Sequence, residues 1–287
     1  MINVLVLNYN DADSVMKLVN CIETYKCIDH IVIVDNCSQD DSFQRLKSIV
    51  DNKVDLVSSG HNGGYGAGNN FGIRYIADHY QSNYILLCNP DVIIKEDVII
   101  KLAGFLQTHD DYVMAAPFML DAEKQKQYNT AFRIPEKWEY IFSLDVFISK
   151  LTKSFHYKGI DSIRSEYKDV EAVSGSLFLL DTNKMLTYGM YDENIFLYCE
   201  EIVLAIKLKK AQLKTALLLT ETFIHNHSVS IDKSFHSQYA KHTLLMKSKL
   251  YVIKNYYNSN RIENLLAYLL SRISLLEVMV ISKIRGK

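Results

Sequence analysis

Short apolar runs alternate with stretches of helical spacing along the first third of the chain. Runs this short, bounded by polar clusters, predict buried strands, and they are Val4–Leu7, Ile31–Val34, Val54–Val57 and Tyr84–Cys88. Between the runs, apolar residues recur every three or four positions, which predicts helices at Asp11–Tyr25, at Asp41–Val50 and in a segment ending at Tyr80. This alternation is typical of βαβ units, so we expect an α/β fold with a mainly parallel sheet flanked by helices.

The pattern is weaker from residue 121 to 169 and then returns. We expect a strand at Val170–Leu180, a helix at Glu200–Ala211 and a strand at Thr215–Thr222. Gln238–Tyr257 and Arg261–Ile284 have helical, apolar sequences studded with Lys and Arg. The chain is therefore predicted to form one domain over residues 1–232 and a C-terminal helical extension over residues 233–287.

The last predicted helix raises the question of a membrane. Its apolar stretch is interrupted by Arg272 and Glu277, and no apolar run reaches the ~18–20 residues of a span, so we expect it not to cross a bilayer. One alternative is packing on the domain or on a second copy in a homodimer. The other is an interfacial helix, with Lys283, Arg285 and Lys287 facing anionic lipid.

Composition narrows the functional class. The 287 residues are 48% hydrophobic and carry a net charge of −1, which argues against a nucleic-acid partner. The N-terminus lacks the basic region of a signal peptide and is interpreted as the first strand. The cysteines are odd in number and scattered, without a C-x-x-C pair, and are expected to be buried reduced thiols of a cytosolic protein: Cys21, Cys27, Cys37, Cys88 and Cys199.

Polar residues follow the predicted strands where each strand ends. Asn8 and Asn10 follow the first, Asp35 and Asn36 the second, and Asp91 the fourth. Ligands of open parallel sheets bind outside the carboxyl ends of the strands. We therefore expect these side chains to gather at one edge of the sheet.

A glycine-rich stretch from His61 to Asn70 has four glycines in six positions. Glycines permit close backbone approach to a ligand, and the helix that follows offers free N–H groups to phosphate. The stretch matches neither a Walker loop nor the dinucleotide-binding pattern, because it follows the third strand. A tight turn without a ligand is the alternative.

Two acidic segments are candidates for chemistry. Asn89-Pro90-Asp91 ends a strand, and its carboxylate can hold Mg²⁺ or Mn²⁺ beside a diphosphate, although the same tripeptide also makes capped turns. Glu200-Glu201 begins a helix and can supply a general base, although acids are favoured there by the helix dipole alone.

Two histidines stand at the end of the strand after that helix. His225 and His227 are two positions apart, which places both rings on one face of an extended chain. One of these histidines can complete a cation site with Asp91. Alternatively, the histidine has only a structural role.

Taken in order, these segments resemble the family-2 inverting glycosyltransferases of the GT-A fold, particularly the rhamnosyltransferase-like bacterial branch. The donor-side motifs are Asn8-Tyr9-Asn10, Asp35-Asn36-x-Ser38-x-Asp40, Asn62-x-Gly64-Tyr65-Gly66-x-Gly68-Asn69-Asn70-x-Gly72 and Asn89-Pro90-Asp91. The later motifs are Val173-Ser174-Gly175, Gly189-x-Tyr191-Asp192-Glu193, Phe196-x-Tyr198-x-Glu200-Glu201 and His225-x-x-Ser228-x-Ser230. The similarity covers roughly residues 2–230.

The resemblance implies a role for each segment. Residues 1–120 would form the nucleotide-sugar-binding half and residues 121–232 the acceptor-side half. Asp91 and His225 would hold a divalent cation, and Glu201 would be the catalytic base. The donor-binding residues would be Asn8, Asn10, Asp35, Asn36, Asn62, Gly64, Gly68, Asn69 and Asn89. The acceptor-side residues would be Ser174, Gly175, Asp192 and Glu200.

The implied activity is transfer of a sugar from a nucleotide-diphosphate donor to a hydroxyl of a cell-surface glycan or lipid-linked oligosaccharide. Rhamnose on dTDP is favoured over a UDP-hexose, at the cytoplasmic face of the cell membrane. Four positions depart from the family pattern: Asn89 stands where Asp is frequent, Glu201 replaces an Asp, and Val203 and Ala205 replace polar residues. A non-catalytic nucleotide-sugar-binding scaffold in a glycan-assembly complex is therefore the alternative. A Rossmann oxidoreductase is disfavoured by the position of the glycine loop.

Overall fold

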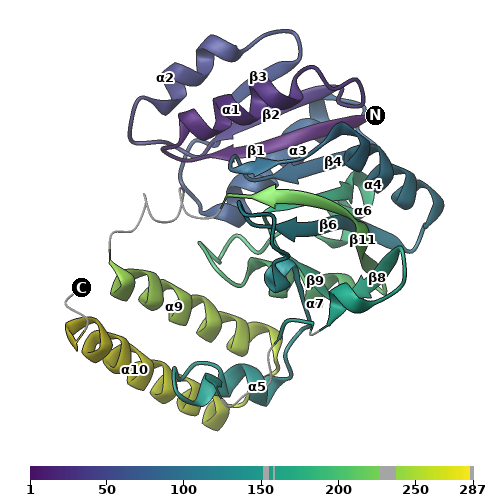
Figure 1. Cartoon of the computed structure of the whole chain (residues 1–287). Helices are drawn as coiled ribbons and strands as arrows, with labels where there is room; N and C mark the ends of the chain where they lie inside the picture. The colour runs from purple at the N-terminus through teal and green to yellow at the C-terminus, as the bar shows by residue number, and fades with distance from the viewer. Residues whose placement is uncertain (151–154, 158, 227–236, 285–287) are drawn as a thin grey trace.

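A computed structural model describes residues 1–150, 155–157, 159–226 and 237–284. Within these residues the chain folds around a nine-stranded sheet in the order β3-β2-β1-β4-β10-β6-β11-β5, with β8 paired to β11 (Figure 1). The strands are β1 (Ile2–Asn8), β2 (His30–Asp35), β3 (Val54–Ser58), β4 (Tyr84–Cys88), β5 (Val92–Ile93), β6 (Tyr112–Leu120), β8 (Tyr167–Val170), β10 (Leu177–Asp181) and β11 (Lys214–His225). A separate pair joins β7 (Ala131–Phe132) to β9 (Ala172–Val173).

The sheet is parallel in its first half and mixed in its second. β1, β2, β3 and β4 pair in parallel, with Asn8 opposite Asp35 and Asp35 opposite Ser58. β10 runs antiparallel between β4 and β6, and β11 pairs in parallel with β6. The parallel half thus brings the polar ends of β1 and β2 together, as the sequence predicts.

Helices cover both faces of the sheet. Alternate strand residues point to opposite faces, and apolar residues on each face pack against helices. One core cluster joins Val4 and Ile33 to α1 (Ala12–Ile22), α2 (Ser42–Leu46) and α4 (Glu96–Thr108). The other joins Leu5 and Val32 to α3 (Tyr65–His79), α6 (Thr182–Tyr188) and α7 (Glu200–Lys210). The predicted α/β architecture is confirmed.

Some elements differ from the sequence prediction. The strand expected at Val170–Leu180 is three strands, β8, β9 and β10. The interruption lies around Ser174, Gly175 and Ser176, where the backbone leaves the sheet. Three elements between Asp91 and Asp121, namely β5, α4 and β6, were not predicted, although β6 is the longest buried run of the sheet.

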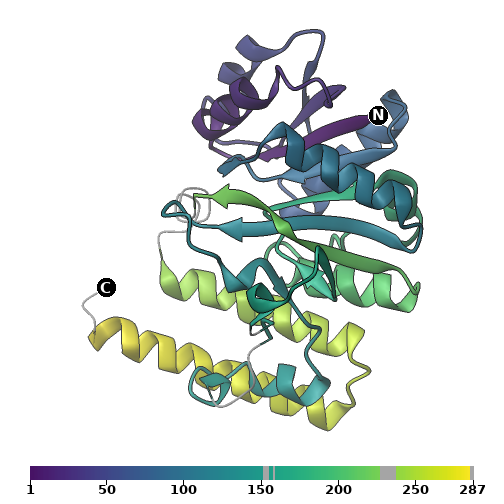
Figure 2. The same cartoon turned by 45° about the vertical axis from the view of Figure 1, so that its right-hand side comes forward.

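The C-terminal extension forms two long helices that lie side by side below the sheet in both views (Figures 1 and 2). They are α9 (Gln238–Tyr256) and α10 (Arg261–Ile284), and α5 (Lys137–Phe142) packs against them. A third apolar cluster joins them to α7, through Val203, Val252 and Ala267 among others. The extension is therefore continuous with the packing of the domain that carries Glu201.

The last helix does contain an apolar stretch long enough to span a membrane, which corrects the premise of the expectation that it does not cross a bilayer. Arg261–Lys283 is long and apolar enough by length and composition, with a mean hydropathy of 1.8, and 28% of its apolar window is buried. Arg272 and Glu277 are too few to break it. A core helix of a soluble protein passes the same test, so a span and a surface helix are not distinguished by it.

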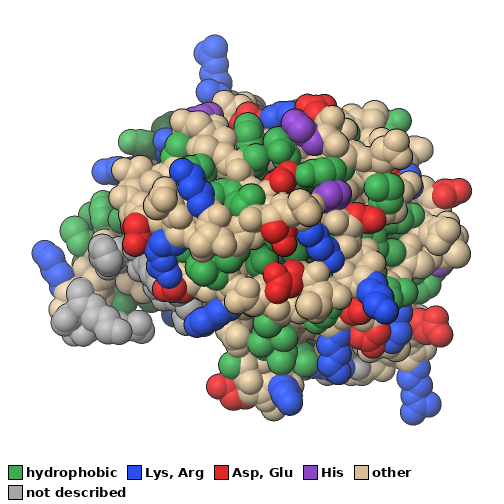
Figure 3. Space-filling model, turned by 90° about the horizontal axis from the view of Figure 1, so that it is seen from above, with side chains coloured by type: hydrophobic (Ala, Val, Ile, Leu, Met, Phe, Trp, Pro, Cys, Tyr) green, Lys and Arg blue, Asp and Glu red, His purple; other side chains and the backbone are tan. Residues whose placement is uncertain are grey.

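The charge distribution on the surface and the burial of the cysteines can be compared with the sequence predictions. Seen from above, basic and acidic side chains are interspersed (Figure 3), in keeping with the net charge of −1. All five cysteines are free, but the expectation that they are buried is wrong for four of them. Only Cys88 is buried, whereas Cys21 is exposed and the rest are intermediate.

Candidate active site

The ends of β1 and β2 form a polar knot. Asn8 donates from Nδ2 to Asp35 Oδ1 (2.8 Å) and to Ser38 Oγ (3.1 Å). Ser38 in turn donates its N–H to Asp35 Oδ2 (3.0 Å) and its hydroxyl to Asp35 Oδ1 (2.6 Å). Asn8 and Asp35 are buried, so each Asp35 oxygen is already held by protein donors. The predicted donor residues thus lie together, and Asp35 shapes the loop that follows β2.

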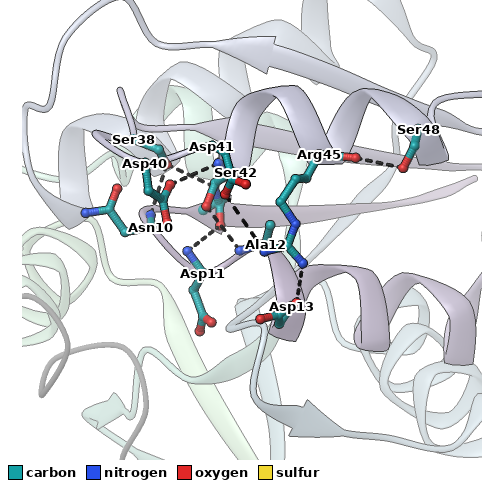
Figure 4. Close-up of polar contacts among 11 residues, drawn as sticks. Asn10, Asp11, Ala12, Asp13, Ser38, Asp40, Asp41, Ser42, Arg45 and Ser48 are labelled. Carbon is teal, nitrogen blue, oxygen red and sulfur yellow. Dashed lines mark hydrogen bonds and ion pairs between the residues drawn. The ribbon is translucent and has the colours of Figure 1, made fainter.

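Asn10 ties this knot to the start of α1. Its N–H donates to Ser38 Oγ (2.9 Å), and its Oδ1 accepts from the N–H of Gln39 (2.7 Å). Asn10 has a φ of 54°, a left-handed conformation that Asn tolerates better than most residues. Nearby, Ser42 and Asp40 fix the start of α2, and Arg45 pairs with Asp13 across the two helices (Figure 4).

The glycine-rich stretch is anchored to the same region. Asn36 donates from Nδ2 to Asn62 Oδ1 (3.0 Å) and to the carbonyl of Gly64 (3.1 Å). Gly64 has a φ of 90°, and a Cβ there would lie 2.0 Å from the carbonyl oxygen of Phe196. Only glycine fits at this position, because the backbone of the segment before α7 passes directly over it.

The helix that follows packs by small and amide residues. A Cβ at Gly68 would lie 2.5 Å from Leu7, and Asn69 donates to the carbonyl of Tyr65 (2.9 Å). Asn70 belongs to the glycine-rich motif, which by itself predicts no role for it. It donates to the carbonyl of Tyr191 and to Glu193, and accepts the N–H of Tyr191 (2.8 Å). Asn70 therefore fastens α3 to the segment that leads to α7, a contact visible only in three dimensions.

Asp91 and His225 meet, although 134 residues separate them. His225 Nε2 lies 3.1 Å from Asp91 Oδ1, and both side chains are about nine-tenths buried. The N–H of Asn226 donates to the carbonyl of Asp91 (3.0 Å), because β11 pairs with β5 directly after Asp91. The other candidate, His227, lies outside the described residues.

The donor set of this pair suits a divalent cation. Two adjacent ligands of an octahedral ion at roughly 2.1 Å would lie about 3.0 Å apart, which matches the 3.1 Å separation. One carboxylate with one imidazole is a set that Mn²⁺ accepts, leaving positions for diphosphate oxygens. No cluster of three or more ligating side chains occurs in the described residues. A cation here would therefore depend on the substrate for its remaining ligands.

Glu201 is held at the start of α7 by the 174–176 loop. Its Oε1 accepts the N–H of Gly175 (3.2 Å), and Tyr65 donates its hydroxyl to the carbonyl of Gly175 (2.6 Å). A Cβ at Gly175 would lie 3.1 Å from Glu201 Oε1 and 3.0 Å from Tyr65 Oη. The absence of a side chain on Gly175 thus lets the loop approach both residues.

The two neighbouring carboxyls hold protons strongly. Burial raises the pKa of Glu200 to about 8, and the charge of Glu201 adds to that rise. Burial also raises the pKa of Glu201, against the backbone N–H groups of Glu201 and Gly175, which lower it. Glu200 is 4% exposed, and its Oε1 has no hydrogen-bond partner. Because the two carboxyls are buried and adjacent, the ionisation of one opposes the ionisation of the other.

The 174–176 loop connects Glu201 to the cation pair. Beside Gly175, which binds Glu201, Ser176 accepts the N–H of Asn89 through its carbonyl (2.8 Å). Ser176 Oγ also contacts the sulfur of Met119, which is 3.4 Å from His225 Nδ1. Ser174 supports the loop through its hydroxyl, 3.1 Å from that of Ser176. Asn89, Ser174, Gly175 and Glu201 are thus brought to one edge of the sheet.

Asp192 is engaged differently from the other acceptor-side candidates. Its Oδ2 accepts the hydroxyls of Tyr256 (2.6 Å) and Tyr251 (2.9 Å), both on α9, and its Oδ1 accepts from Asn194. Burial opposes ionisation, but these hydrogen bonds prevail and lower the pKa of Asp192. In this structure the carboxylate fastens α9 to the segment before α7. Its predicted contact with an acceptor stays a prediction.

Comparison with known proteins agrees with this geometry. The sequence profile of the family described as "Glycosyl transferase family 2" matches residues 3–167. The chain is 24% identical over 238 residues to the low-salt glycan biosynthesis hexosyltransferase Agl10 of Haloferax volcanii, covering 83% of this chain and 71% of that protein. It is 25% identical over 222 residues to the rhamnosyltransferase WbbL of Escherichia coli K12, covering 74% and 78%.

Solved structures share the fold at low identity. GalNAc-T7 with UDP, GalNAc and Mn²⁺ superposes with a TM-score of 0.61 and 11% identity, covering 97% of this chain but 56% of that one. The mannosyltransferase PcManGT of Pyrobaculum calidifontis, in complex with GDP-Man and Mn²⁺, gives 0.56 and 10%, covering 100% and 76%. The expected GT-A-type fold is thereby confirmed.

Proposed function

The chain belongs to glycosyl transferase family 2, and from this premise we propose that it is an inverting, metal-assisted enzyme with Glu201 as general base. The proposed donor is a dTDP- or UDP-linked sugar, with rhamnose favoured because WbbL is a rhamnosyltransferase. The proposed acceptor is a hydroxyl of a cell-surface glycan or lipid-linked oligosaccharide, since Agl10 acts in glycan biosynthesis.

One observation carries the proposal. The 174–176 loop binds Glu201 through the N–H of Gly175 and, one residue later, the N–H of Asn89 through the carbonyl of Ser176. A proton acceptor and the Asp91–His225 pair are therefore supported by the same three residues. An acceptor hydroxyl and a donor diphosphate bound at these two points would lie next to each other, as a single displacement requires.

The proposed reaction balances in one step. The ionised Glu201 takes the proton of the acceptor hydroxyl, whose oxygen forms a bond to the anomeric carbon as the bond to the nucleoside diphosphate breaks. The configuration at that carbon inverts. A cation held by Asp91 and His225 would neutralise charge on the departing diphosphate. The loop that Asn8 and Asp35 hold in place, together with Asn36, would bind the nucleoside.

We place the protein at the cytoplasmic face of the membrane through α10. Apolar residues at helical spacing are at least 47% exposed along this helix: Ile262, Leu265, Leu269, Ile273, Leu276 and Val280. The exposed charges of α10 are all basic, namely Arg261, Arg272 and Lys283. Glu263 is buried and paired with Lys137, and Glu277 accepts the N–H of Val146. Exposed apolar residues together with basic charges favour an anionic lipid surface as the partner of α10. A second copy of the chain is less suitable, because its α10 would bring the same positive charges against the first.

Replacement of the base tests the reaction. Donor turnover is measured as release of nucleoside diphosphate from dTDP-rhamnose and UDP-hexoses with Mn²⁺, and donor binding by thermal shift. Glu201→Gln should lower turnover by about 10²–10⁴-fold, the range for general acid–base catalysis, while donor binding persists. Glu123→Gln, at an exposed position outside the motifs, is the matched control. Binding without turnover in the unaltered protein would instead identify a scaffold.

A further inference from the structure

A cavity of about 370 Å³ lies between α9 on one side and residues 143–149 and 155–156 on the other, apart from the residues of the proposed reaction. Three basic side chains line it: His156, His242 and Lys249. Its other walls include the apolar residues Phe155, Leu245 and Met246, and no acidic side chain is among its described lining residues. The cavity therefore combines positive charge with apolar surface.

Lys249 is the main charge of this cavity. Its Nζ donates to the carbonyl (2.9 Å) and the hydroxyl (3.1 Å) of Ser143, and lies 5.7 Å from the centre of the Tyr140 ring. An ammonium carries three donors, so one remains. Burial lowers the pKa of Lys249, and the neighbouring Cys199 acts in the opposite direction. Within the described chain, Lys249 has no ion-pair partner.

Two acids that contact residues 146–148, at the cavity wall, are already engaged. Asp145 Oδ1 accepts the N–H groups of Phe147 and Ile148, and Glu277 Oε2 accepts that of Val146. The pKa of His242 is lowered mainly by burial and, to a smaller extent, by the positive charge of Lys249. A half-buried cation without a counter-charge is unfavourable, and an anion entering the cavity would offset that cost.

We infer that this cavity binds the phosphate group of an amphiphilic, lipid-phosphate ligand, with Lys249 and His242 on the phosphate and the apolar walls on the first units of its chain. Charge selects an anion, and the apolar walls distinguish a lipid phosphate from the free ion. The inference rests on the proposed function, because a lipid-linked acceptor would present such a group.

The cavity is close to the base without overlapping it. Tyr140, whose ring centre lies 5.7 Å from the Lys249 ammonium, packs in the same apolar cluster as Cys199. Cys199 directly precedes Glu200, and the charges of Lys249 and Glu201 both act on its thiol. A phosphate at Lys249 would therefore leave the sugar end of an acceptor within reach of α7.

Binding is tested on the full chain without donor or metal, using farnesyl phosphate and inorganic phosphate as probes in isothermal titration. We expect farnesyl phosphate to bind at least tenfold more tightly than inorganic phosphate, and Lys249→Met to weaken it at least tenfold. Lys247→Met, an exposed lysine on the same helix, should bind like the unaltered protein. Equal affinity for both probes would assign the site to free phosphate.

A second measurement needs no variant. Farnesyl phosphate should shift the ring signals of His242 in the NMR spectrum of the unaltered protein, since His242 and Lys249 line the same cavity. Absence of binding, or binding that Lys249→Met leaves unchanged, would overturn the inference. Because no donor is present, either result leaves the Glu201 experiment untouched, so failure of the two proposals can be told apart.

Discussion

At the residue scale, the buried Glu200 makes the fold sensitive to pH. Its pKa of about 8 lies above the ordinary glutamate value of roughly 4.3, so the folded state holds a proton that the unfolded state releases. The stabilisation is complete below the unfolded pKa and is lost as pH rises through about 8. Glu200→Gln keeps the neutral form. From the unfolded pKa up to about pH 8, its free energy of unfolding should therefore rise relative to that of the unaltered protein, by at most about 1.4 kcal/mol per pH unit.

Urea unfolding of both proteins at several pH values measures this difference. Glu166→Gln, at an exposed position before β8, serves as the control and should run parallel to the unaltered protein. Parallel curves for Glu200→Gln as well would show that the proton is not held in the fold.

The cation pair gives a prediction for metal binding. His225→Asn removes the imidazole that lies 3.1 Å from Asp91, so Mn²⁺ affinity in the presence of nucleoside diphosphate should fall by about tenfold or more, each factor of ten being about 1.4 kcal/mol. His79→Asn changes an exposed histidine on α3 and should have no effect. Calorimetric titration with Mn²⁺ measures this affinity. An affinity unchanged in His225→Asn would show that His225 is not a ligand of the metal.

Gly64 gives a prediction for the backbone. In Gly64→Ala the new Cβ would meet the Phe196 carbonyl at 2.0 Å in a conformation with φ of 90°, so we expect a loss of about 1–3 kcal/mol in the free energy of unfolding. Gly104→Ala is the matched contrast, because its Cβ meets nothing within 4 Å inside α4. It should gain about 0.4–1 kcal/mol. A Gly64→Ala protein as stable as the original would mean that the 196 segment moves away freely.

At the scale of elements, the sequence predicts what local periodicity encodes. β1 to β4 and α1 to α3 were predicted because each apolar run or stripe is bounded by polar residues. The meeting of Asn8 with Asp35 followed from parallel strands ending at one edge. The path of the chain at Gly175 is not encoded locally: Ser174, Gly175 and Ser176 interrupt the apolar residues of Val170–Leu180, and a glycine there permits a bulge without fixing the direction in which the chain turns. What bends the chain there is contact with Glu201 and Asn89, which lie elsewhere in the sequence.

The same reason explains the residues that were missed or given another role. Asn70 forms hydrogen bonds with Tyr191, and Asp192 forms hydrogen bonds with α9. These partners are distant in the sequence, so residue spacing does not predict them. Sequence motifs identify which residues gather at this edge of the sheet, but only the tertiary structure shows which of them contact one another. Lys249 does not stand out in the sequence, because one lysine among many on a helix becomes distinctive only when it is buried.

The brace between α9 and Asp192 is testable as an element. Tyr256→Phe removes a hydrogen bond to a carboxylate (2.6 Å), and such bonds contribute roughly 1.5–3 kcal/mol. We expect a loss of that order in chemical unfolding, growing smaller as pH falls and Asp192 is protonated. Tyr239→Phe, on an exposed tyrosine of the same helix, should change stability little. An equal loss in both variants would argue that α9 is not fastened through Asp192.

At the scale of the whole molecule, charge and apolar surface are distributed unequally. The net charge is −1 and the face seen from above is mixed (Figure 3), so no general field draws the protein to an anionic surface. The exposed side of α10 differs, because its charges are basic and its remaining exposed residues are largely apolar. Attraction to lipid should therefore reside in this helix rather than in the protein as a whole.

The double variant Leu265→Glu and Leu276→Glu tests this location. It places two negative charges among side chains that are each 58% exposed, so the fold should tolerate them while the lipid surface repels them. Co-sedimentation with phosphatidylglycerol vesicles should fall at least tenfold, and binding by the unaltered protein should weaken with salt. Ile100→Glu, a 54% exposed residue on α4, should bind vesicles as before. If instead the unaltered protein ignores vesicles and sediments as a dimer that the double variant dissociates, the face of α10 joins two copies of this chain.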